Sequence, residues 1–60
     1  MVYVQIKDGI ILNRIILNDA ALESAFIVGY DYLKRVDELS PEPQLGWLYD
    51  SGTDTYSEPV

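Results

Sequence analysis

The sequence contains no cysteine and no histidine. These absences exclude disulfides, zinc sites built from Cys and His, and the nucleophile–histidine pairs of serine and cysteine hydrolases. Positive charge is also scarce, because four Lys and Arg stand against ten Asp and Glu and give a net charge of −6. Proteins that bind nucleic acid need Lys and Arg to neutralise phosphates, so this charge balance argues against nucleic acid as a partner.

Long apolar segments are absent as well. No run approaches the roughly 20 apolar residues that a membrane-spanning helix requires, and the N-terminus lacks the charged and apolar regions of a signal peptide. We therefore expect a soluble protein with no membrane partner. The 60 residues, 48% of them hydrophobic, suffice for one small domain with a thin stability margin. Association with another chain is the remaining means of supporting so small a core.

The first 19 residues carry the clearest structural signal. Residues 2–6 and 10–17 are rich in β-branched side chains, and Asp8-Gly9 lies between them. Asp-Gly between two strand-forming segments is typical of a type I′ turn, in which both central residues need positive φ. The sequence therefore predicts a β-hairpin closed by a two-residue loop.

The register of this hairpin follows from counting outward from the turn. The expected pairs are Lys7 with Ile10, Ile6 with Ile11, Val4 with Asn13, Tyr3 with Arg14, and Val2 with Ile15. Paired residues share a face, so the core face should hold Val2, Val4, Ile6, Ile11, Asn13, Ile15 and Leu17. The other face should hold Tyr3, Gln5, Lys7, Ile10, Leu12, Arg14 and Ile16. This second face is too apolar to be solvated, so a second layer of the protein or another subunit is expected to cover it.

The rest of the chain predicts one helix and three short strands. Asn18 and Asp19 can cap a helix over residues 20–28, whose Leu22 and Phe26 form a narrow apolar stripe and which Gly29 would end. A third strand is expected over residues 30–36, a proline-containing loop over 37–45, and an aromatic hairpin from segments 46–50 and 55–56. The predicted class is α+β, with a single domain over residues 1–56 and a tail at 57–60.

Few residues suggest chemistry. The turn over residues 50–54 offers the oxygen ligands that calcium prefers, but its acids are four apart with no closing Glu, which favours a plain turn stabilised by side chains. The four glycines are too far apart for a phosphate-binding loop, and a glycosidase pair of carboxylates needs a cleft that so short a chain has little room for. We therefore expect no enzymatic activity, no metal and no cofactor. Asn13 is expected to bond to backbone at the sheet edge rather than to act as a buried specificity group.

Two stretches resemble a known family. Residues 7–19 form a hairpin that leads to a helix cap, and Gly46-Trp47-Leu48-Tyr49-Asp50 is followed by Tyr56. Together they resemble a small module of tailed bacteriophages, found as short virion proteins and at the ends of tail-fibre chains. In that module a Gly-Trp-x-Tyr-Asp-Gly-x-x-aromatic hairpin closes the domain, whereas the turn here is longer. Members are structural parts, so the resemblance implies no catalytic residue.

The resemblance and the apolar second face predict a non-enzymatic virion protein of a tailed phage. It would bind other virion proteins or a copy of itself, in the tail and fibre apparatus or as a capsid decoration. The expected partner contacts are Tyr3, Ile10, Leu12, Ile16, Trp47 and Tyr49.

Two alternatives remain open at this point. Trp47, Tyr49 and Tyr56 could form a stacking platform for a glycan at a fibre tip, or could simply complete the core. Residues 31–60 hold two basic residues against seven acids, so the chain could also be an acidic host-directed inhibitor that mimics nucleic acid.

Overall fold

The computed structural model describes residues 1–59, which fold into one antiparallel sheet and one helical segment. The strands are β1 (Val2–Lys7), β2 (Ile10–Ile16), β3 (Tyr32–Arg35), β4 (Leu48–Asp50) and β5 (Thr55–Ser57), in the spatial order β3-β1-β2-β4-β5. The helical segment consists of a 3₁₀ turn, η1 (Ala20–Leu22), and one α-helical turn, α1 (Glu23–Phe26). The predicted α+β class is confirmed.

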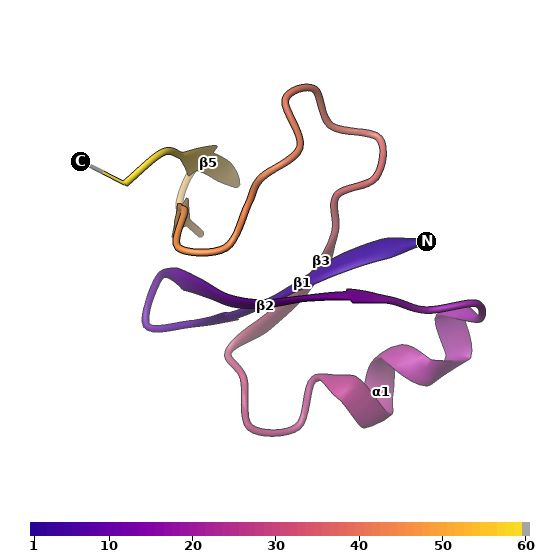
Figure 1. Cartoon of the computed structure of the whole chain (residues 1–60). Coiled ribbons are helices and arrows are strands. Elements are labelled where there is room, and N and C mark those ends of the chain that lie inside the picture. The colour runs from indigo at the N-terminus through magenta and orange to yellow at the C-terminus, as the bar shows by residue number, and fades with distance from the viewer. Residues whose placement is uncertain (60) are drawn as a thin grey trace.

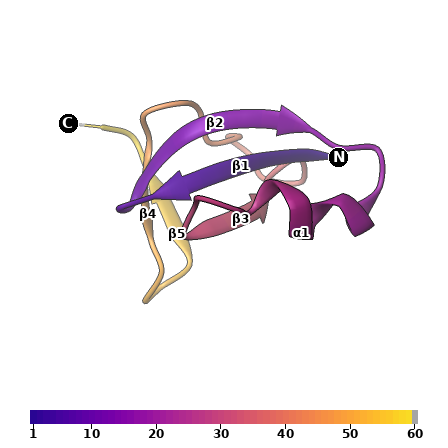
Figure 2. The same ribbon diagram turned by 90° about the horizontal axis from the view of Figure 1, so that it is seen from below.

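The sheet lies between two layers of chain. The helical segment covers one face, and the loop after β3 together with the β4–β5 hairpin covers the other (Figure 1). Seen from below, α1 lies beside β1 and β3 (Figure 2). We call the first the helix face, marked by Tyr3 and Gln5, and the second the C-terminal face, marked by Val4 and Ile6. Each apolar surface of the first hairpin is therefore partly covered by the protein itself.

The turn of the first hairpin is as predicted. Asp8 and Gly9 have φ of 54° and 74°, so both central residues adopt the left-handed conformation of a type I′ turn. Next to the turn, Lys7 pairs with Ile10 and Ile6 pairs with Ile11.

Beyond Ile11 the predicted register is wrong by one residue. A bulge places Leu12 as an extra residue of β2, and the pairs that follow are Gln5 with Asn13, Val4 with Arg14, Tyr3 with Ile15, and Val2 with Ile16. A shift of one residue moves every later side chain to the opposite face. Counting outward from the turn failed because it assumes one residue of β2 for each residue of β1.

The bulge redistributes the side chains of β2. Asn13 and Ile15 lie on the helix face, whereas Arg14 and Ile16 share the C-terminal face with Val4 and Val2. Leu12 precedes Asn13 in the strand, and neighbouring side chains alternate between faces, so Leu12 also lies on the C-terminal face. The sequence prediction had placed Asn13 and Ile15 in the core and had grouped Leu12, Arg14 and Ile16 with Tyr3.

The main core lies on the C-terminal face. Its buried members are Val4, Ile6, Ile11, Val36 and Tyr49, and Val2, Trp47 and Tyr56 pack against them. The sheet curls enough for the Tyr49 ring of β4 to reach the Tyr32 ring of β3, with ring centroids 5.3 Å apart. Side chains of β3 and β4, which are separated by two strands in the sheet, thus meet above the core.

The helical segment begins where predicted but ends earlier. The Asp19 side chain accepts a hydrogen bond from the Ala21 N–H, and the α-helical turn ends at Phe26 instead of Val28. Gly29 has a φ of 90° but lies two residues beyond the C-cap Ile27, in the turn that follows the helix, so it does not end the helix as predicted. The predicted apolar stripe is not buried, since Leu22 is 43% and Phe26 41% exposed.

Polar contacts attach this segment to the sheet instead. The Tyr3 hydroxyl donates to Glu23 Oε2 at 2.6 Å, and Gln5 Nε2 donates to the Phe26 carbonyl at 2.8 Å.

The later strands differ from the prediction only in their bounds. β3 covers Tyr32–Arg35 within the predicted 30–36, β4 starts at Leu48 instead of Gly46, and β5 extends to Ser57. Of the predicted tail, residue 60 lies outside the described residues.

Candidate functional site

The six predicted partner contacts do not form one surface. Tyr3 and Tyr49 are buried, at 2% and 8% exposure, and Trp47 is half-buried. The three aliphatic residues are exposed, with Ile10 at 39%, Leu12 at 47% and Ile16 at 67%. The structure therefore divides the set into a buried aromatic part and an exposed aliphatic part on β2.

Tyr3 is wrongly predicted as a partner contact. Its ring lies under the helical segment, and its hydroxyl donates to Glu23 Oε2. That carboxylate stabilises the protonated phenol and raises the pKa of Tyr3. A second layer of the same chain thus covers this part of the helix face.

Tyr49 is likewise not a free anchor. Its ring centroid lies 5.3 Å from that of Tyr32 and 5.1 Å from that of Tyr56, and its hydroxyl donates to Asp54 Oδ1 at 2.7 Å. Lys34 Nζ lies 5.7 Å from the Tyr32 and Tyr49 ring centroids and 3.9 Å from Asp54 Oδ1. Burial, with help from Asp54, raises the pKa of Tyr49 to about 12. Tyr49 therefore offers no open ring face, which removes it from the proposed glycan platform.

β2 has an open outer side beyond its bulge. β4 pairs with β2 only at Ile10–Leu48, and the last backbone contacts on this side join Ile11 N–H to the Trp47 carbonyl and Gly46 N–H to the Ile11 carbonyl, both at 2.9 Å. Within residues 1–59, no strand pairs with the outer side of Leu12–Ile16. We call this segment the β2 edge.

The direction of the backbone groups on the β2 edge follows from the pairing of β1. Val36 N–H donates to the Val2 carbonyl on the β3 side, so even-numbered residues of β1 bond to β3 and odd-numbered ones to β2. Tyr3 and Gln5 then bond to Ile15 and Asn13, whereas the backbone groups of Arg14 and Ile16 point outward. An extended segment of another chain can pair with such groups.

The β2 edge carries little protection against pairing. Edges are commonly blocked by proline or by an unpaired charge, but segment 12–16 contains no proline. Its one charged residue, Arg14, is neutralised because Nε donates to Glu42 Oε1 at 2.7 Å. Exposed Leu12 and Ile16 flank this ion pair.

The remaining candidates have plain structural roles. Asp50 Oδ1 accepts from Gly52 N–H at 2.9 Å, as expected for a turn stabilised by its own side chain. Asn13 Nδ2 donates to the Tyr30 hydroxyl at 2.7 Å and not to backbone, contrary to the prediction.

In the described part of the chain no three acidic side chains gather as a metal site would require. Neither η1 nor α1, the helical pieces of residues 1–59, is long and apolar enough to cross a membrane.

Comparisons with protein-family models, with curated proteins and with solved structures found no match to this chain. The function is therefore inferred from the geometry of the described residues and from the two sequence motifs.

Sequence reasoning missed a second surface, a pocket between the helical segment and β3. Ala20, Ala21 and Ser24 contribute small side chains to it, and Leu33 of β3 also lines it. The run of small residues in the segment 20–25 was the available signal, but it was interpreted only as helix-forming.

Proposed function

We propose that this protein is a non-enzymatic accessory protein of a tailed-bacteriophage virion that attaches to a larger repeating assembly through the β2 edge. The tail and fibre apparatus and the capsid surface are the two proposed locations. The observation that carries the attachment is the exposure of Leu12 and Ile16, at 47% and 67%, on a strand whose outer side is unpaired within the described chain.

Attachment at this edge combines two sources of free energy. A partner strand would satisfy the outward backbone groups of Arg14 and Ile16, and the flanking Leu12 and Ile16 would lose contact with water. At about 25 cal/mol per Å², an apolar patch of a few hundred Å² contributes several kcal/mol before the entropy of association is subtracted. Copies bound around a symmetric particle would strengthen a modest contact through avidity.

The virion assignment is supported by the resemblance of residues 7–19 and 46–56 to the phage module. These two segments are in direct contact, since Tyr49 N–H donates to the Gly9 carbonyl at 2.8 Å and Ile11 N–H donates to the Trp47 carbonyl. Their contact is consistent with one module that contains both motifs.

The test is a mass-spectrometric census of purified phage particles from cells that express the tagged chain during infection. We expect the wild-type protein to co-purify with the particles. The I16K variant places a charge on the β2 edge and should reduce the bound amount by about tenfold or more, because an apolar contact of roughly 1.5–3 kcal/mol is lost.

V28K is the matched control, because Val28 is 76% exposed and lies in the turn between α1 and β3, outside the β2 edge. It should bind like the wild type. Absence of the wild-type chain from particles, together with a monomeric mass at high concentration, would refute the proposal. Equal loss in I16K and V28K would refute the role of the β2 edge.

A further inference from the structure

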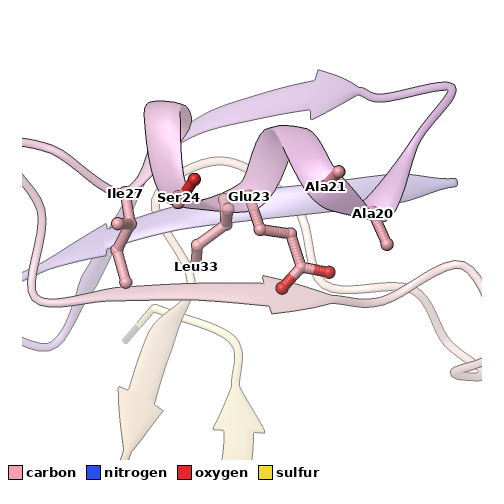
Figure 3. Close-up of a pocket in the computed structure, with 6 residues that line it drawn as sticks. All are labelled: Ala20, Ala21, Glu23, Ser24, Ile27 and Leu33. Carbon is pink, nitrogen blue, oxygen red and sulfur yellow. The ribbon is translucent and has the colours of Figure 1, made fainter.

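A groove lies between the helical segment and β3, on the side of the sheet away from the β2 edge. Its pocket has a volume of about 380 Å³ and is lined by Ala20, Ala21, Glu23, Ser24, Ile27 and Leu33. Figure 3 shows the side chains of Glu23 and Ile27 reaching from the helical segment toward β3, with Leu33 between them. The floor is apolar, and Glu23 is the one charged residue of the lining.

The strand that borders this pocket has an open outer side. β3 is the outermost strand at its end of the sheet. The Val36 N–H donates to the Val2 carbonyl, and Lys34 and Tyr32 follow Val36 at alternate positions, so they also direct their backbone groups toward β1. The backbone groups of Leu33 and Arg35 therefore point outward, and no backbone group within residues 1–59 bonds to them.

The open strand and the pocket are in register with each other. A residue of an added antiparallel strand that pairs with Leu33 has its side chain on the same face as Leu33. Leu33 pairs with Gln5 on the helix face and lines the pocket. The side chain opposite Leu33 would therefore enter the pocket, and its two neighbours in the strand would point to the C-terminal face.

The charge of the groove favours a basic side chain. Glu23 Oε2 accepts the Tyr3 hydroxyl, and Oε1 has no hydrogen bond in the described part of the chain. The nearby Arg35 is already engaged, because its guanidinium donates to Asp37 at 2.7 and 3.0 Å and lies 3.5 Å from Glu38. A lysine or arginine can lay its aliphatic stem on Leu33 and Ile27 and keep its charged end near Glu23.

We propose that the groove between α1 and β3 binds an extended segment of a basic partner protein, which adds to β3 as an antiparallel strand and places a lysine or arginine in the pocket beside Glu23. This site is a second one beyond the proposed function, and it uses no residue of the β2 edge. A chain with both sites would join two partners at opposite sides of its first hairpin.

The probe is the peptide acetyl-TVTKTVT-amide, titrated into the ¹⁵N-labelled full chain and followed by NMR. We expect saturable shifts and slower hydrogen exchange at the amides of Leu33 and Arg35, because these N–H groups become hydrogen-bonded. Methylation of the lysine backbone nitrogen should abolish binding, since that N–H faces β3. Methylation of the preceding threonine nitrogen is the matched control and should preserve binding, since that N–H points away from β3.

Two variants of the protein test the pocket. S24F adds a ring at an exposed position of the lining and should block the peptide while leaving the unfolding curve unchanged. E23Q keeps an acceptor for the Tyr3 hydroxyl but removes the charge, so the lysine peptide should bind about two- to fivefold more weakly. E58Q, which removes a charge from the exposed C-terminal segment, should leave the affinity unchanged.

Several results would overturn this proposal. They are the absence of shifts at millimolar peptide, shifts confined to amides of the β2 edge, and equal affinity for a peptide with norleucine in place of lysine. Self-association that the peptide displaces would identify a second copy of the chain as the occupant instead. The I16K variant should bind the peptide like the wild type, so failure of the groove and failure of the virion attachment are separate outcomes.

Discussion

Truncation of the isoleucines of β2 tests the bulge at Leu12. Ile11 is 1% exposed within the core of the C-terminal face, whereas Ile16 is 67% exposed. Without the bulge, Ile16 would lie on the face of Tyr3, beneath the helical segment, and its truncation would resemble that of a buried residue. The two substitutions I11A and I16A remove the same three carbon atoms, so their difference reports burial alone.

The magnitudes follow from the exposed fractions. Removing three buried methyl or methylene groups costs about 2.4 kcal/mol in transfer free energy, and the remaining cavity raises the total to roughly 3–4 kcal/mol. The same truncation at Ile16 loses about a third of the transfer term, or less than about 1 kcal/mol. A domain of this size has roughly 3–9 kcal/mol of stability, so I11A should lose from about a third of the free energy of unfolding to all of it.

Urea unfolding followed by circular dichroism measures the change in the free energy of unfolding for I11A and I16A. If I11A does not fold, I11V replaces it in the series and should cost about 0.5–1.5 kcal/mol. A loss above about 2 kcal/mol in I16A, or equal losses in I11A and I16A, would refute the register described above.

Three further predictions concern other parts of the chain. The pKa of Tyr49 is raised from 10.0 in the unfolded chain to about 12, so the contribution of this hydroxyl to stability should be fully present below pH 10 and be lost between pH 10 and 12. Unfolding midpoints measured between pH 9 and 12 should decline less in Y49F than in the wild type. Gly9 has a φ of 74°, so G9A should lower the free energy of unfolding by about 1–2 kcal/mol in urea titrations, and no loss would contradict the turn geometry. Y3F deletes only the hydroxyl that donates to Glu23. Hydrogen exchange should therefore accelerate at the Ile27 amide, which donates to the Glu23 carbonyl, and stay unchanged at the Ile11 amide. Unchanged exchange at both amides would show that other contacts hold the helical segment.

The first hairpin shows how far local sequence determines this fold. Asp8-Gly9 imposes its own turn conformation, so the pairs nearest to it were predictable from residues 2–11 alone. The bulge was not predictable, because Ile11 is bonded on its outer side to Gly46 and Trp47, which are 35 and 36 residues away. A register that depends on such distant contacts cannot be derived from a strand pattern.

The helical segment and the candidate site likewise combine features that local sequence determines with features that depend on distant contacts. Asp19 marked the start of the helical segment through local backbone chemistry. The side that faces the sheet was set by hydrogen bonds from Tyr3 and Gln5, about 20 residues earlier in the chain. The sequence predicted Ile16 as a partner contact on the same face as Tyr3, whereas the bulge places it on the opposite face, where it is exposed. The burial of Tyr3 was not predicted, because it required a partner carboxylate that no pattern in β1 indicates.

The extra residue at Leu12 divides β2 into two parts with different neighbours. Residues 10 and 11 are held between β1 and the segment 46–48, whereas residues 12–16 are held by β1 alone on the strand side. Substitutions in the second part can therefore alter what the surface recognises without disturbing the turn or the aromatic hairpin. Of these residues, Leu12 and Ile16 are exposed on the C-terminal face, so their side chains can be exchanged with little effect on the packing of the core.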